Sequence, residues 1–190
     1  RRIRKLDDNN HFADIDRKAP AALTGKEKTF AGKSLLELTE RWPSRVRPAY
    51  WNRFYDAVKE KKRGALPFRV WQIFDEMRDF AKAGDLTKFV CAAGLMAHYV
   101  GDACQPLHVS ELHHGSSEEE SGVHSAYETA MLNRYAAEMI AALGALRDAG
   151  VPSAKLARTG HDAAVAVVEL MRRTVTRLPP QRVIEVYSEN

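Results

Sequence analysis

The sequence predicts an all-α protein, a single-domain helical bundle that spans residues 1–190. Long segments carry apolar residues at the three- and four-residue spacing of helices, whereas the alternation typical of strands is scarce. The length of 190 residues suits one ordinary domain with its own core. Hydrophobic residues make up 45% of the chain and charged residues 28%, as expected for a globular domain.

The first half of the chain contains four predicted helices, over residues 33–41, 51–62, 67–83 and 86–104. Each has an apolar face that would pack against the others. The third is the clearest, because Pro67 lies near its first turn and Gly84 follows its last residue. The fourth is so apolar that we expect it in the middle of the bundle.

The second half contains two predicted helices, over residues 123–148 and 154–177. The intervening residues 109–123 are polar and acidic and are predicted to form a loop. Pro179 and Pro180 are expected to end the regular structure, since proline cannot continue a helix.

The overall composition leaves several functions open. The formal charge of +4 allows an anionic substrate, nucleic acid or a lipid surface, but identifies none of them. No apolar run approaches the roughly 18 residues that a membrane span needs. If residues 86–104 are one helix, Cys91 and Cys104 lie roughly 20 Å apart, too far for a disulfide.

Ligand-type residues gather between residues 98 and 128. His98 and Asp102 are four residues apart and share one helix face, as do His124 and Glu128. His108 lies between the two pairs. One His-x-x-x-Asp pair alone would more often be structural, but these nitrogen and oxygen donors together suit Zn²⁺. Five donors exceed the need of one tetrahedral ion, so we predict a multinuclear zinc site between helices.

A second polar segment reads His11-Phe12-Ala13-Asp14 in an extended or irregular run. A single histidine in such a segment is usually a surface residue, so the residues alone assign it no role. The chain has no Gly-x-Ser-x-Gly elbow or other motif for a covalent nucleophile.

These segments together resemble the zinc-dependent bacterial phospholipases C and the related fungal and plant single-strand-specific nucleases. The shared pattern is His-aromatic-hydrophobic-Gly-Asp, then Gln-Pro-hydrophobic-His, then His-x-x-x-Asp/Glu, and it lies within residues 93–128. The segment that begins at His11 resembles a second family segment, in which a ligand histidine precedes an aromatic residue and an aspartate.

The resemblance implies a site with two or three zinc ions. Its ligands would be His11, His98 and Asp102 for one ion, and His108, His124 and Glu128 for a second. Asp102 would also bridge to a third ion, which makes it the implied catalytic residue, and Phe12 and Asp14 would bind substrate. Family members complete the site with an upstream aspartate, an N-terminal tryptophan and a nearby histidine. We find no counterpart here, which implies either a missing N-terminal part or a reduced site.

The function that the resemblance implies is zinc-dependent hydrolysis of a phosphodiester by a metal-activated water. Phospholipid is slightly favoured as the substrate, because Glu128 stands where the nucleases typically have aspartate. Single-stranded nucleic acid is the alternative, and a non-catalytic helical domain with a structural or decayed metal site is another. The implied location is secreted or periplasmic, although the chain opens without the apolar core of a signal peptide. The sequence does not determine the oligomeric state.

Overall fold

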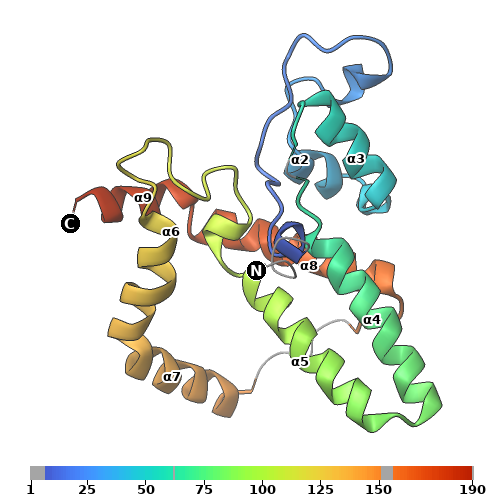
Figure 1. Cartoon of the computed structure of the whole chain (residues 1–190), viewed down its shortest axis with the longest axis vertical. Coiled ribbons are helices and arrows are strands. Elements are labelled where there is room, and N and C mark those ends of the chain that lie inside the picture. Colours follow the sequence, from blue (N-terminus) through green and yellow to red (C-terminus); the bar gives the residue numbers. More distant parts are fainter. Residues whose placement is uncertain (1–6, 62, 151–155, 190) are drawn as a thin grey trace.

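The computed structural model describes residues 7–61, 63–150 and 156–189 (Figure 1). Within these residues the regular structure is helical, and isolated bridges such as the one between Lys18 and Ser34 are its nearest approach to a sheet. The predicted all-α class is therefore confirmed. None of the helices in the described ranges is long and apolar enough to cross a membrane.

The helical elements follow one another without intervening strands in the described part of the chain. They are η1 (Asp8–Asn10), η2 (Gly25–Phe30), α2 (Leu35–Glu40), η3 (Pro43–Arg45), α3 (Pro48–Ala57), α4 (Leu66–Ala83), α5 (Leu86–Asp102), η4 (Pro106–His108), α6 (Val123–Ser125), η5 (Ala126–Met131), α7 (Leu132–Asp148), α8 (Gly160–Arg177) and α9 (Pro180–Ser188). The element η5 is a π-helix, and it joins α6 to α7 without a break.

The helices α4, α5 and α8 form the frame of the molecule. A tight turn joins α4 to α5, in which Gly84 adopts a left-handed conformation and Asp85 caps α5 by accepting from the Lys88 amide. The helix α8 lies along the other side of α4 (Figure 1). The buried side chains of Val70, Ile73 and other core residues fill the space between these helices.

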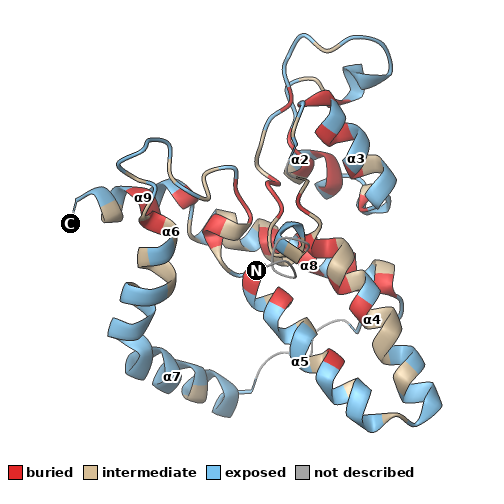
Figure 2. Ribbon diagram, in the orientation of Figure 1, coloured by how far each residue is buried: buried red, intermediate tan, exposed pale blue. Residues whose placement is uncertain are grey.

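The prediction that residues 86–104 lie in the middle of the bundle is wrong. Among the described residues, α4 packs on one face of α5, and the buried residues of α5 are Ala92, Tyr99 and Asp102. Leu86 and Val90 on another face are 71% and 59% exposed, and the pale blue of α5 and α7 in Figure 2 shows how open these helices are. An apolar composition shows that a helix has surface to bury, but not whether a neighbour covers it.

Two further predictions at the C-terminal end need correction. Regular structure does not stop at Pro179, because Pro180 takes the first helical position of α9, where a missing amide hydrogen costs nothing. The last long helix begins at Gly160, where Thr159 forms a capping box with Asp162. The predicted start at residue 154 lies outside the described residues.

The segment before α2 packs against the helical frame and so places His11 beside it. The amide of Ala13 donates to the His108 carbonyl at 2.9 Å, and the amide of Leu66 donates to the Phe12 carbonyl at 3.3 Å. Gly64 lies so close that a Cβ atom there would come within 2.5 Å of the Ala13 Cα atom. This packing holds His11 beside the C-terminal end of α5.

Candidate metal centre

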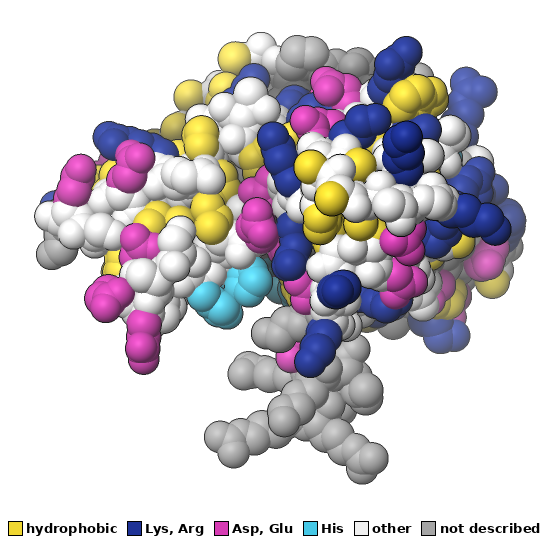
Figure 3. Space-filling view, turned by 90° about the horizontal axis from the view of Figure 1, so that it is seen from above, with side chains coloured by type: hydrophobic (Ala, Val, Ile, Leu, Met, Phe, Trp, Pro, Cys, Tyr) yellow, Lys and Arg dark blue, Asp and Glu magenta, His cyan; other side chains and the backbone are white. Residues whose placement is uncertain are grey.

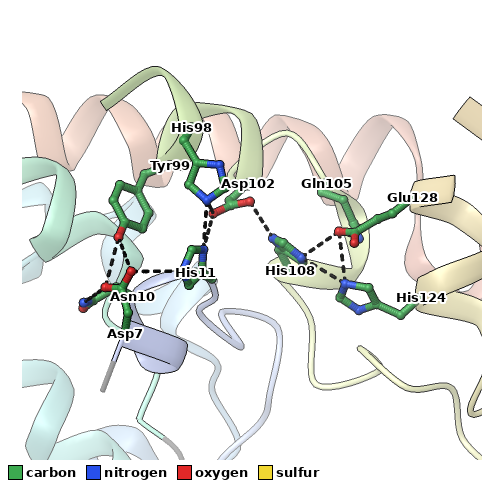
Figure 4. A network of polar contacts seen from close by, with 10 residues as sticks. All are labelled: Asp7, Asn10, His11, His98, Tyr99, Asp102, Gln105, His108, His124 and Glu128. Atoms are coloured by element: carbon green, nitrogen blue, oxygen red, sulfur yellow. Dashed lines mark hydrogen bonds and ion pairs between the residues drawn. The ribbon is translucent and has the colours of Figure 1, made fainter. Parts of the chain in front are cut away.

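The first ligand group joins the N-terminal segment to α5. The ligand atoms are His11 Nδ1, His98 Nε2 and Asp102 Oδ2. The two nitrogens are 3.1 Å apart, and the Asp102 oxygen lies 3.0 Å from His11 and 3.4 Å from His98 (Figure 4). His98 is more open than the sequence suggests, because 53% of its side chain is exposed.

The second ligand group joins η4 to the continuous helix of α6 and η5. The atoms His108 Nε2, His124 Nε2 and Glu128 Oε1 form a triangle with sides of 2.9, 3.0 and 3.1 Å. His124 and Glu128 stand four residues apart on one face, and Pro106 turns the chain after α5 so that His108 meets them. The structure thus brings together all six ligands that the resemblance implies, as two groups of three.

The shape of both triangles fits a metal ion. A tetrahedral Zn²⁺ ion with bonds of about 2.0–2.1 Å separates its ligand atoms by about 3.3 Å. The six observed separations lie between 2.9 and 3.4 Å. Hydrogen bonds alone satisfy such a triangle poorly, because three contacts require three hydrogens while two ring nitrogens offer at most two. A cation at the centre satisfies all three atoms at once.

An outer carboxylate orients the first ligand group. The Asp7 carboxylate lies 3.3 Å from His11 Nε2, the ring nitrogen that does not face the ligand triangle. Asn10 donates to Asp7 at 2.8 Å, and the Tyr99 hydroxyl donates to it at 3.0 Å. The Asn10 bond, followed by the Tyr99 and His11 contacts, outweighs burial and lowers the pKa of Asp7. Such outer partners fix the tautomer and angle of a metal-ligating imidazole.

Sequence reasoning missed Asp7. A histidine four residues after an aspartate was the only available signal, and the polar surroundings of residues 1–10 hid it. The structure therefore does place an upstream carboxylate beside His11, although it contacts the outer nitrogen of the ring.

The second group has its own outer partners. His124 Nδ1 lies 3.0 Å from the backbone carbonyl of His113, which directs Nε2 toward the ligand triangle. The Gln105 amide donates to Glu128 Oε1 at 3.2 Å, and its carbonyl accepts from the Leu107 amide. Both ligands are thus held in place by neighbouring polar groups.

Asp102 connects the two groups. Its Oδ2 atom belongs to the first triangle, while its Oδ1 atom lies 3.1 Å from His108 Nδ1, on the far side of the ring from the second triangle. The contact has the distance of an ion pair and is not a regular hydrogen bond. Burial raises the pKa of Asp102, but the contacts with His108, His11 and His98 outweigh it and lower the pKa overall. The carboxylate is therefore ionised at neutral pH.

A cavity of about 460 Å³ opens over both groups. Its lining includes five histidines from different parts of the chain: His11, His108, His113, His114 and His124. Phe12 also lines the cavity, and its ring centroid lies 6.1 Å from that of His113. The space-filling view shows exposed histidines gathered in one place on the surface (Figure 3). A ligand in this cavity would lie against the proposed metal positions.

Asp14 differs from Phe12 in being almost wholly buried. It is 3% exposed, and its Oδ1 atom has no hydrogen-bond partner and lies 3.9 Å from His113 Nδ1. Burial, followed by the charges of Asp16 and Glu60, raises the pKa of Asp14 to about 7. The sequence-based assignment of Asp14 to substrate binding stays a prediction.

Replacing Asp14 with asparagine should change how stability depends on pH. Because the folded pKa lies above the ordinary value near 3.9, the folded state holds the proton more tightly, and stability falls as pH rises from about 4 to 7. The loss is on the order of 4 kcal/mol. Asp14→Asn should abolish most of this fall in urea unfolding of chelator-treated protein, whereas the exposed Asp148→Asn should keep it. Parallel pH curves for wild type and Asp14→Asn would contradict the raised pKa.

Comparison with known proteins finds a relative that is named as an enzyme. The chain is 34% identical over 215 residues to a probable serine protease of Bradyrhizobium tropiciagri. The match covers 95% of this chain and 26% of the relative, so the chain spans about a quarter of that protein's length. No protein-family model matches the chain, and no solved structure matches it.

The expected phosphodiester hydrolase function is contradicted by this relative. A probable serine protease fits neither a phospholipase C, nor a nuclease, nor any other phosphodiesterase. The physical reason for the error is that a pattern of ligand residues indicates which ion a site could hold, but not which bond the site cleaves. The bond that is hydrolysed depends on how the cavity binds substrate, and the motif does not describe the cavity.

Among the described residues, no serine hydroxyl is hydrogen-bonded to a histidine of either ligand group. Serine proteases place the serine hydroxyl against a histidine that an aspartate orients. Ser110 follows His108 closely in sequence, but it is fully buried and its hydroxyl donates to Asp16. Its hydroxyl is thus engaged by a carboxylate and screened from the cavity.

Proposed function

We propose that this chain is a zinc-binding helical domain of a hydrolytic enzyme, with one Zn²⁺ ion in each ligand group. The observation that carries the proposal is the pair of ligand triangles, whose sides of 2.9–3.4 Å match tetrahedral zinc. The outer contacts of Asp7, Asp102 and the His113 carbonyl support it, because they orient three of the four imidazoles as metal-site partners do.

Different residues of the site would bind the metal ions and line the place for substrate. Three protein ligands to each ion leave a position open, and the cavity gives solvent and substrate access to it. Zinc at these positions would supply a Lewis acid and lower the pKa of a coordinated water. Asp102 and Glu128 supply the negative charge that holds the cations, and His113, His114 and Phe12 line the place where substrate would lie.

The arrangement of ligands supports a metal centre built like that of the phospholipase C and nuclease superfamily. The substrate class does not follow from this likeness. The name of the Bradyrhizobium relative favours a peptide or protein substrate. Since the chain matches only 26% of that relative, peptide hydrolysis by this domain is part of the proposal.

Purified protein should contain two zinc ions per chain by elemental analysis. It should also cleave a labelled casein substrate, with 1,10-phenanthroline abolishing cleavage and phenylmethylsulfonyl fluoride leaving it unchanged. Less than one zinc ion per chain after zinc addition would refute the metal proposal. Cleavage that resists the chelator and stops with the sulfonyl fluoride would assign catalysis to a serine.

A further inference from the structure

The helix α7 carries an apolar stripe that nothing covers in the described structure. None of its 17 residues is buried. The stripe consists of large side chains spaced three, four or seven residues apart: Leu132, Tyr135, Met139, Ile140, Leu143 and Leu146. Ile140, Leu143 and Leu146 are 70%, 64% and 63% exposed. Such a stripe is the face that a helix uses to pack against another helix.

The helix α5 presents a second apolar surface. Leu86 and Val90 are exposed on it, and a Cβ atom added to Gly94 or Gly101 on the same face would meet nothing within 4 Å. Lys88 and Asp102 are the only residues of α5 that carry a full charge at neutral pH. A helix could therefore lie close against this surface without burying many charges.

The two surfaces together are large enough to form a protein interface. The eight exposed apolar side chains on the two surfaces present on the order of 800 Å² together. A stable interface needs about 800 Å² from each partner. The exposed surface of one chain is thus enough for its half of a dimer.

In the described structure, α7 of the same chain does not cover α5. The helix α7 continues η5 and α6 without a break, and this continuous helix holds His124 and Glu128 in the second ligand group. In Figure 1, the helix bends after η5, and α7 runs back beneath the molecule but stands apart from α5.

We infer that two copies of this chain pair in solution through these surfaces, with α7 of each copy packed on α5 of the other. An exchange of this kind is isologous and closes with twofold symmetry, so it produces a dimer and no larger assembly. It buries both apolar surfaces and keeps the helix that carries His124 and Glu128 intact.

Light scattering coupled to size-exclusion chromatography tests the pairing. The wild-type chain should have the mass of two chains, and Ile140→Glu and Leu143→Glu should each give the mass of one chain. Circular dichroism and zinc content should stay unchanged, because both side chains are exposed in the monomer. The matched control Glu138→Lys lies on the same helix, outside the stripe, and should remain dimeric.

Crosslinking tests which helices meet. In a Cys104→Ser background, cysteines placed one at a time at Ala136, Ile140 and Leu143 should join to the native Cys91 of α5 between chains through a short bismaleimide. Adding Cys91→Ser should remove that product. A wild-type chain that is monomeric at its highest soluble concentration would overturn the inference, and so would a dimer that both glutamate variants leave intact. Absence of any Cys91-dependent crosslink would overturn the pairing of α7 with α5.

Discussion

Replacing Asp102 with asparagine should remove zinc from the first ligand group and weaken it in the second. The variant keeps the size of the side chain but loses the negative charge that faces His11 and His98, and an amide hydrogen must then face one of the two groups. Loss of a direct ligand should lower zinc affinity by at least about 100-fold, because changes to outer partners alone cost about 10–100-fold. The second group should lose affinity within that smaller range, since Asp102 contacts the outer nitrogen of His108.

Elemental analysis and competition with a fluorescent chelator measure both effects. Zinc content should fall from two ions to one or fewer, with the remaining ion released more readily than in wild type. Asp79→Asn is a suitable control, since Asp79 is an exposed residue of α4 whose side chain pairs with Lys82 at 3.5 Å and lies outside both ligand groups. Two tightly held zinc ions in Asp102→Asn would show that Asp102 is neither a ligand nor a link between the groups.

Substitutions of Glu128 should lower the zinc affinity of the second ligand group by amounts that depend on the charge and the length of the new side chain. Glu128→Gln keeps the length but removes the anion, so zinc affinity of this group should fall about 100-fold or more. Glu128→Asp keeps the charge and shortens the side chain by one methylene, so the loss should be smaller. The first group should keep its zinc in both variants, because the polar contacts of Glu128 in the described structure are with His108, His124 and Gln105, and none of these belongs to the first group.

The same titrations separate a ligand from an ordinary surface pair. An exposed ion pair contributes only about 0–1 kcal/mol, so zinc binding would then be nearly equal in all three proteins. Glu138→Gln provides the matched control on α7, where the side chain is exposed and outside both groups. Equal zinc affinity for wild type, Glu128→Gln and Glu128→Asp would remove Glu128 from the ligand group.

Local periodicity accounts for the parts of the centre that the sequence could predict. Residues four apart on a helix share a face whatever the rest of the chain does, so His98 with Asp102, and His124 with Glu128, were recognisable as pairs. The helices themselves follow for the same reason, and their observed ends differ from the predicted ones by only a few residues at α4 and α5. The hydrolysed bond is not a local property, and the phosphodiester expectation was wrong for that reason.

The sequence by itself determined the all-α class and a set of nitrogen and oxygen donors, because both depend on residue type and short-range spacing. The tertiary structure decided which donors meet. It brought His11 next to His98 of α5, 87 residues further along the chain, and placed Asp7 against the outer nitrogen of the His11 ring. It also directed the two carboxylate oxygens of Asp102 toward different ligand groups. It also left the apolar faces of α5 and α7 uncovered. Contacts of this kind depend on how segments far apart in the sequence pack together. The residues next to a side chain in the sequence do not specify which distant residues it contacts.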